Sequence, residues 1–539
     1  MAVVRATPAD PTVGMASVTG VSGDQRAIPP ELGPDSLAVL SGPTFLYSDA
    51  RGDVPPGSIG GLVHLDTRLI SGWTLTVNGS ELLLLRAETL EHYSAQYVLT
   101  NPELPGLPPN SLAMRRLRYV GDGFHERLEL LSFQTEPVRV EVRLAVGVDF
   151  ADLFEVKSVV RDRSAKIVRD HAADGSELCF SYRNGDFFAE TRVRCATAAD
   201  RIDGDDLVWD LWLLPREGRQ LDLHVPLPPG MGVVEPVRGD IADVIHGRAD
   251  DPLRRWTEDR AVLRSDNQTL ERTIRQSRDD LAALRLDLEV KGQRILLPGA
   301  GLPWFLTVFG RDTLITAYQT LVAGPALAKG ALLTLARLQG ETCDDFTDEE
   351  PGKILHEVRS GELTRTGQKP YSPYYGTADA TQLWLILLSE YWRWTCDDET
   401  VRHLHDNALA ALRWIDEYGD RDGDGFVGAE ANRISLAMID AAEQFGHRLP
   451  EALSGYDRQR LLFAVPYPTA CSPQAWAAGA PLALIRAMLG INPVDGRLTL
   501  DPDIPPEFGR ITAHRVRAFG QEWGVEAVGT SGNVRLDAR

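Results

Sequence analysis

The amino-acid sequence predicts a multidomain protein in which a β-sandwich precedes a helical domain. The chain has 539 residues, which is more than one ordinary domain needs. From about residue 44 to 227, apolar residues recur with a period of two, in short runs separated by Gly, Pro and Asp. Beyond about residue 265 the period becomes that of a helix. This order predicts an antiparallel sandwich followed by packed helices.

The β half is assigned to residues 43–250. Its clearest strand places Val138, Val140, Val142 and Leu144 on one face and charged residues on the other. A second run, 221–227, repeats the alternation. Residues 1–42 are rich in Ala, Pro, Gly, Ser and Asp without periodicity, so we expect a disordered tail there.

The helical half is assigned to residues 258–492, with a β-like tail over 493–539. The first helix follows Ser265 or Asp266 as N-cap, and the last follows Ser472 with Pro473 at its first position. The apolar spacing predicts seven helices: 270–284, 312–322, 325–339, 379–394, 399–418, 434–445 and 473–489.

The net charge and the spacing of the cysteines argue against several classes of function. The formal net charge is −21, so the chain lacks the basic footprint that nucleic-acid binding needs. The five cysteines are scattered without a CxxC pair, which favours a reducing compartment over a disulfide framework or zinc site. No signal pattern or membrane-length apolar run is present, so we expect a cytoplasmic protein without a membrane partner.

The segment 301–312 contains the first candidate site. Trp304, Phe305, Arg311 and Asp312 stand immediately before a predicted helix. Flat aromatic surfaces suit the CH faces of a sugar, and charged groups suit its vicinal hydroxyls. The alternative is an N-capping Asp312 with core aromatics, and the local chemistry leaves both open.

Two further loops contain acidic and aromatic residues. The segment 348–359 includes Glu357, and the segment 374–381 includes Tyr375 and Asp379. The alternatives are a solvated acidic loop and a helix cap. Residues 420–427 begin like a calcium-binding EF-hand loop, but the twelfth position is Ala431 where a bidentate Glu is required. We therefore expect an Asp/Gly turn there, and neither a metal nor a cofactor.

Long motifs in both halves resemble the bacterial glycogen-debranching, amylo-α-1,6-glucosidase-like family. They include FLYSDARGDVPPGSIGGLVHLDTRLISGW, GLPWFLTVFGRDTLITAYQT, DEEPGKILHEVRSGEL and SPYYGTADATQLWLILLSEYWRWT. The resemblance implies an N-terminal β-sandwich and an (α/α)6 toroid, the six-hairpin glycosidase fold. It also implies a sugar subsite lined by Arg311, Asp312, Glu357, Tyr375 and Asp379, with an α-glucan or oligosaccharide as partner.

The sequence departs from that family near residues 428–433. An (α/α)6 toroid needs twelve helices and only seven are predicted, so we expect an incomplete, open ring. The family's two catalytic carboxylates lie on loops without a counterpart here, so the catalytic residues are unassigned. We therefore expect a glycoside hydrolase of α-glucan metabolism, by resemblance inverting, whose activity is impaired. The alternative is a non-catalytic, glucan-binding remnant.

Overall fold

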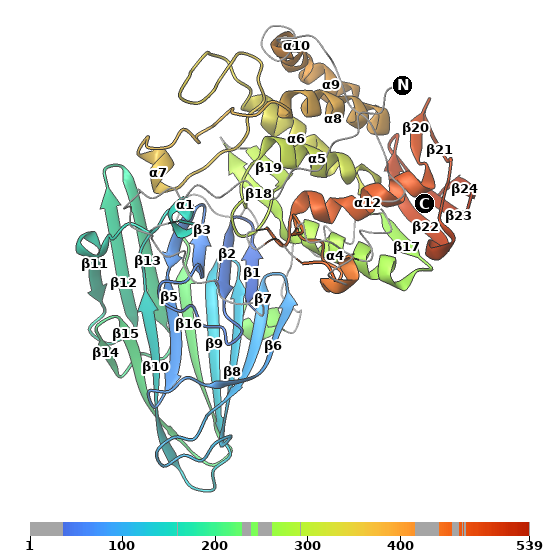
Figure 1. Cartoon of the computed structure of the whole chain (residues 1–539). Helices are drawn as coiled ribbons and strands as arrows, with labels where there is room; N and C mark the ends of the chain where they lie inside the picture. The colour runs from blue at the N-terminus through green and yellow to red at the C-terminus, as the bar shows by residue number, and fades with distance from the viewer. Residues whose placement is uncertain are drawn as a thin grey trace, which may run out of the picture.

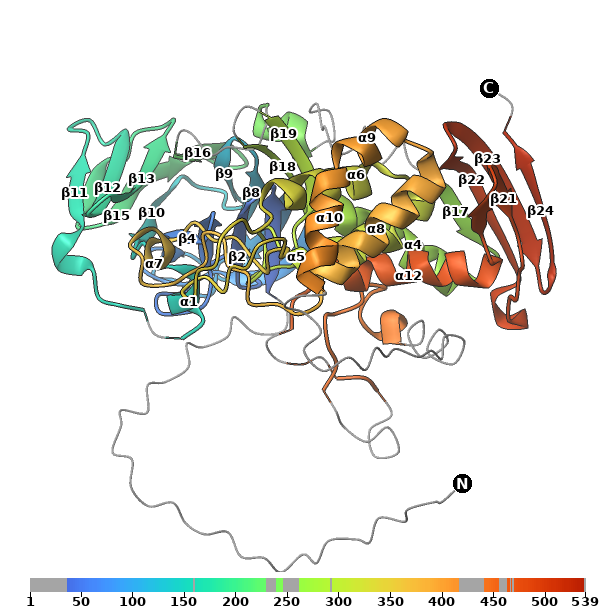
Figure 2. The ribbon, with the colours of Figure 1, turned by 90° about the horizontal axis from the view of Figure 1, so that it is seen from above.

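The computed structural model describes residues 36–158, 160–228, 239–245, 261–290, 293–415, 441–454, 463–465, 467 and 470–537. The predicted order of domains is confirmed: antiparallel sheets form the N-terminal half, and helices follow. Figure 2 shows the helices between the N-terminal sheets and a C-terminal group of strands.

The sandwich consists of a large and a small antiparallel sheet. The large sheet has the order β11 (Val168–His171), β12 (Glu177–Asn184), β13 (Phe187–Cys195), β16 (Gly218–Pro226), β9 (Gly123–Ser132), β8 (Leu112–Val120), β7 (Ser94–Thr100) and β6 (Leu83–Glu91). The small one has the order β14 (Arg201–Asp203), β15 (Asp206–Leu213), β10 (Val138–Gly147) and β5 (Gly72–Val77). As the alternation predicts, Val140, Val142 and Leu144 are buried between them.

A third sheet lies at the end of the sandwich that faces the helices. It contains β1 (Leu37–Ser41), β2 (Thr44–Ser48), β3 (Gly61–His64) and β4 (Thr67–Ile70). Because β1 begins at Leu37, the expected tail does not extend to residue 42, and its first 35 residues lie outside the described part of the chain. Figure 1 shows this sheet below the helical domain.

Six of the predicted helices have counterparts. They are α4 (Gln268–Ala283), α5 (Gly310–Gln319), α6 (Ala326–Arg337), α8 (Ala380–Thr395), the broken pair α9 (Asp398–His403) and α10 (His405–Trp414), and α12 (Ala475–Leu489). Two N-cap predictions are wrong: Asn267 caps α4 through its side chain, and α12 starts after Gln474. Most of the predicted helix 434–445 lies outside the described residues.

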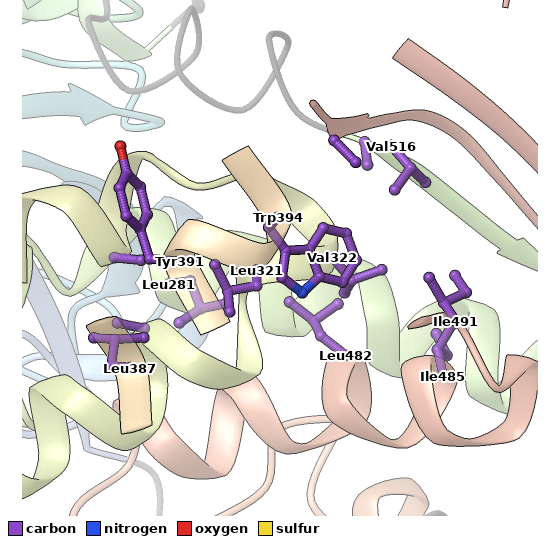
Figure 3. Close-up of a cluster of buried hydrophobic side chains, with 14 of the residues drawn as sticks. Leu281, Leu321, Val322, Leu387, Tyr391, Trp394, Leu482, Ile485, Ile491 and Val516 are labelled. Carbon is purple, nitrogen blue, oxygen red and sulfur yellow. The ribbon is translucent and has the colours of Figure 1, made fainter. Parts of the chain in front are cut away.

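The described helices pack around one core. α12 packs against both α4 and α5, α5 packs on α6 and α8, and α10 packs on α8. Figure 3 shows how Leu281, Leu321, Trp394 and Leu482 meet in this core. The last helix of the described chain therefore packs against the first.

The C-terminal strands are more than a tail. β22 (Arg510–Ala518), β23 (Gln521–Val528) and β24 (Ser531–Leu536) form a sheet with β17 (Val262–Ser265), which directly precedes α4. Two hairpins complete the described strands: β18 (Arg285–Val290) with β19 (Gln293–Pro298), and β20 (Asn492–Val494) with β21 (Arg497–Thr499). No helix in the described part of the chain is long and apolar enough to cross a membrane.

Short helices lie where the sandwich meets the helical domain. α1 (Leu153–Val156) is capped by Asp152, whose other oxygen accepts a hydrogen bond from the N–H of Leu363 in α7 (Glu362–Arg365). Arg163 pairs with Glu155 of α1 and with Glu362 of α7. α2 (Ile241–Ile245) covers part of the outer face of the large sheet.

Candidate functional site

The first turn of α5 presents Arg311 and Asp312. The helix begins after Phe309, which has an extended backbone, so Asp312 is not its N-cap. Gly310 fits this position because a Cβ there would lie 2.0 Å from the carbonyl oxygen of Leu355. The start of α5 is thereby held close to the segment that leads into His356 and Glu357.

Arg311 lies between two carboxylates that come from different helices. Its Nε atom is 3.8 Å from Oδ2 of Asp312, and its Nη1 atom is 3.7 Å from Oδ2 of Asp379, which precedes α8. The Arg311 side chain is 48% exposed. The predicted convergence of these three residues is therefore present, at distances too long for direct hydrogen bonds.

Asp379 occupies the N-cap position of α8 without capping it. Its side chain makes no cap hydrogen bond, and its Oδ1 atom accepts one from Oγ1 of Thr377 at 2.7 Å. The capping alternative for Asp379 thus fails, and its second oxygen faces Arg311. Asp312 is more buried, and its Oδ1 atom accepts a hydrogen bond from Nε2 of Gln474 at 3.0 Å.

Burial raises the pKa of the Asp312 carboxyl, and Arg311 opposes this shift. Glu451 adds to the rise in pKa by like-charge repulsion, whereas His356 lowers it. Glu451 therefore lies within electrostatic range of Asp312, although the sequence reasoning did not select it. The Glu451 carboxylate accepts a hydrogen bond from the N–H of Cys471 at 2.9 Å, which fixes it beside the approach to α12.

His356 is the second residue that sequence reasoning missed. Its ring packs edge-to-face against Phe309 and Tyr374. Its Nδ1 atom is buried without a hydrogen-bond partner among the described residues. Burial lowers the pKa of His356, so the ring is neutral at pH 7 and can donate or accept one hydrogen bond. The one sequence feature that could have indicated His356 is its position directly before Glu357.

Four expected subsite residues are placed differently from the expectation. Glu357 is buried and accepts a hydrogen bond from Nε of Arg359 at 2.6 Å. Tyr375 is 3% exposed, and its hydroxyl donates to the carbonyl oxygen of Leu338. Trp304 is buried and Phe305 half-buried, and the ammonium of Lys157 lies over both rings. The polar groups or ring faces of these side chains already have protein partners, so the four residues support the site and do not line it.

Comparison with known proteins agrees with this architecture. Residues 39–224 match the family described as the N-terminal domain of some glycogen debranching enzymes. The structure is similar to that of "Putative kojibiose phosphorylase from human microbiome", with a TM-score of 0.55 at 7% identity over 93% of this chain and 92% of that one. Superpositions on a polysaccharide lyase and a sialidase have TM-scores of only 0.19 and 0.25. The comparison with curated protein sequences finds no match.

The family match covers the sandwich, and the structural similarity at 7% identity extends to the fold of nearly the whole chain. The resemblance to glycogen-debranching proteins is confirmed for the N-terminal domain. The multidomain fold, with antiparallel sheets followed by helices, is similar to that of the phosphorylase structure.

Proposed function

We propose that this chain is an amylo-α-1,6-glucosidase-like protein of α-glucan metabolism that binds a terminal glucose unit beside Arg311. The observation that carries the proposal is the position of Arg311 between Asp312 and Asp379, with separations of 3.8 and 3.7 Å. Five cysteines that are all free thiols fit a cytoplasmic location for this role.

The charge arrangement suits a neutral polyol. A carboxylate accepts hydrogen bonds from two neighbouring hydroxyls, and a guanidinium donates in a fixed fork. Arg311, Asp312 and Asp379 carry both kinds of group without pairing closely enough to satisfy one another. A sugar with adjacent hydroxyls can therefore replace water between them at little electrostatic cost.

We further propose that hydrolysis is impaired. Glycoside hydrolysis uses one carboxyl group as acid and a second as base or nucleophile. Glu357 is tied to Arg359, and Asp379 is held by Thr377 and faces Arg311. The sequence also lacks the family's acid and base loops. Proton transfer from a positioned group contributes about 10²–10⁴-fold to rate, so its loss should leave little turnover.

A working hydrolase is the second candidate, and one observation favours it. Asp312 has a raised pKa and Glu451 lies within electrostatic range of it. A carboxyl group with a raised pKa can act as general acid, and a second, ionised carboxylate can activate water. On this alternative Asp312 is the acid and Glu451 the base.

One experiment separates binding from turnover. Maltotetraose binding is measured by calorimetry, and glucose release is measured from branched limit dextrin. We expect the wild-type chain to bind, the Asp312→Ala and Arg311→Ala variants to bind at least about tenfold more weakly through loss of charged hydrogen bonds, and the exposed-site control Asp406→Ala to bind normally. Release by the wild type should not exceed that of Asp312→Ala.

The sugar site and the impaired hydrolysis would be contradicted by different results. Equal binding by the wild type and Asp312→Ala, or no binding by the wild type, would refute the sugar site. A clear release rate that disappears in both Asp312→Ala and Glu451→Gln would refute the impairment and establish the hydrolase.

A further inference from the structure

Three aromatic side chains stand in one row on the large sheet, far from α5 in the sequence. Tyr119 of β8 is in register with His125 of β9, which is in register with His224 of β16. Their rings stack, with centroids 4.2 Å apart for the first pair and 4.1 Å for the second. The register therefore fixes two imidazoles side by side on the face that α2 partly covers.

The turn between β8 and β9 brings a carboxylate to this pair. The Oδ1 atom of Asp122 is 2.9 Å from Nε2 of His125. Gly123 allows the approach, because a Cβ at that position would lie 2.5 Å from Nε2 of His224. One ligand atom from each of Asp122, His125 and His224 lies within 4.8 Å of the other two.

The second imidazole, that of His224, has a ring nitrogen without a partner in the described part of the chain. Nε2 of His224 is buried and makes no hydrogen bond among the described residues, a state that costs free energy unless something binds there. It lines a cavity of about 320 Å³ together with His125.

Two arginines near the cavity pair with carboxylates. Arg127 pairs with Asp222 at 2.6 Å and with Asp240 at 3.1 Å, and Arg194 pairs with Glu177 at 3.0 Å. Glu177 also pairs with Arg192 at 2.9 Å, so the charge of Arg194 is only partly offset. The Asp122 carboxylate supplies the negative charge among the three ligands.

We propose that Asp122, His125 and His224 form a binding site for a divalent transition-metal ion of the zinc type. Two imidazole nitrogens and one carboxylate oxygen are a ligand set that such ions prefer, with a fourth position left to water. Zinc ligands lie about 2.0–2.2 Å from the ion, so the two stacked imidazoles must rotate out of their near-parallel arrangement for their nitrogens to converge with Asp122 on it. The bound ion ties the β8–β9 turn to β16.

The test is a titration of the full chain, freed of metal by a chelator, with zinc chloride, monitored by calorimetry. Binding of Co²⁺, monitored by its visible absorption, provides a second readout. We expect one equivalent to bind. Changes around a metal ligand typically weaken metal affinity 10–100-fold, so the loss of a ligand in His125→Gln, His224→Gln or Asp122→Asn should cost at least about tenfold. The control His171→Gln, an exposed histidine on β11, should bind as the wild type does.

Asp122→Asn protects the test against misfolding, because Asp122 is exposed in a turn. A thermal scan adds an independent measure: zinc should raise the melting temperature of the wild type and of His171→Gln but not of the three site variants. No binding to the wild type, unchanged affinity in Asp122→Asn and His224→Gln, or an equal loss in His171→Gln would overturn the proposal.

Discussion

His64 is a buried imidazole at the end of β3, where the sandwich faces the helical domain. Its Nδ1 atom is 2.7 Å from Oγ1 of Thr44. Burial lowers the pKa of His64 to about 4, and Asp66 opposes the shift. Below pH 6.5 the unfolded chain binds a proton at this residue and the folded chain does not, so stability falls as the pH falls from about 6.5 to about 4.

A substitution isolates this effect from all other titrating groups. His64→Asn keeps a polar atom near the hydroxyl of Thr44 but cannot bind the proton. Between pH 7 and pH 5 the wild type should lose about 2 kcal/mol of unfolding free energy relative to this variant, since each pKa unit corresponds to about 1.4 kcal/mol. Urea denaturation at the two pH values measures the difference. Equal losses of stability in the wild type and in His64→Asn would contradict the prediction. The exposed-site variant His171→Asn keeps His64 and should lose as much stability as the wild type.

Single residues also show how far the sequence could predict the site. Arg311, Asp312 and Asp379 were predictable because each stands at a helix start, and helix starts gather at one end of packed helices. The burial of Tyr375 was not predictable, because the segment around it has no regular apolar period that would separate it from the half-buried Tyr374. Glu451 was missed since its relation to Asp312 arises only in the folded chain.

The connection between α6 and α8 joins the site to the sandwich through Arg359. This buried side chain donates to Glu357 at 2.6 Å, to Asp66 at 3.0 Å and to the carbonyl oxygen of Trp304 at 2.9 Å. Its two carboxylate partners come from opposite sides of the domain boundary. Arg359 thus sets the position of Glu357 behind the candidate site and holds the two domains together.

Removing Arg359 should therefore destabilise the protein strongly. Arg359→Met keeps most of the volume and leaves two buried carboxylates without their cation, which typically costs about 3–5 kcal/mol. Chemical denaturation measures the loss. Arg402→Met is the matched control, because Arg402 is exposed and pairs with Asp398 within α9, where such pairs contribute less than about 1 kcal/mol. Similar losses in both variants would refute this account of the boundary.

Elements were predicted well where their signal was local and poorly where it was not. The apolar spacing located α5, α6 and α8 to within a few residues of their bounds. The role of β17 could not be read from spacing, because its partner β22 follows more than 200 positions later. The segment before α12 reads as a helix start, yet the N–H of Ser472 and the carbonyl of Pro473 bond to Leu302 and hold it extended.

On the scale of the whole molecule, the described helices differ in how far their apolar faces are covered. α12 packs against α4 and buries residues such as Leu281 and Leu482. By contrast, α10 leaves Leu409 and Leu412 exposed by 45% and 48%. These two side chains are three positions apart and lie on one helix face.

An exposed apolar face of this kind favours contact between molecules. We expect the wild type to self-associate as concentration rises and the double variant Leu409→Lys/Leu412→Lys to remain monomeric, as measured by sedimentation velocity. Because both side chains are already half exposed, each change should alter the unfolding free energy by no more than about 0.5 kcal/mol. Phe133→Lys, at an apolar position on the sandwich that is 56% exposed, is the control and should leave self-association unchanged. If the wild type stays monomeric, or if Phe133→Lys reduces self-association as much as the double variant does, the face with Leu409 and Leu412 does not mediate self-association.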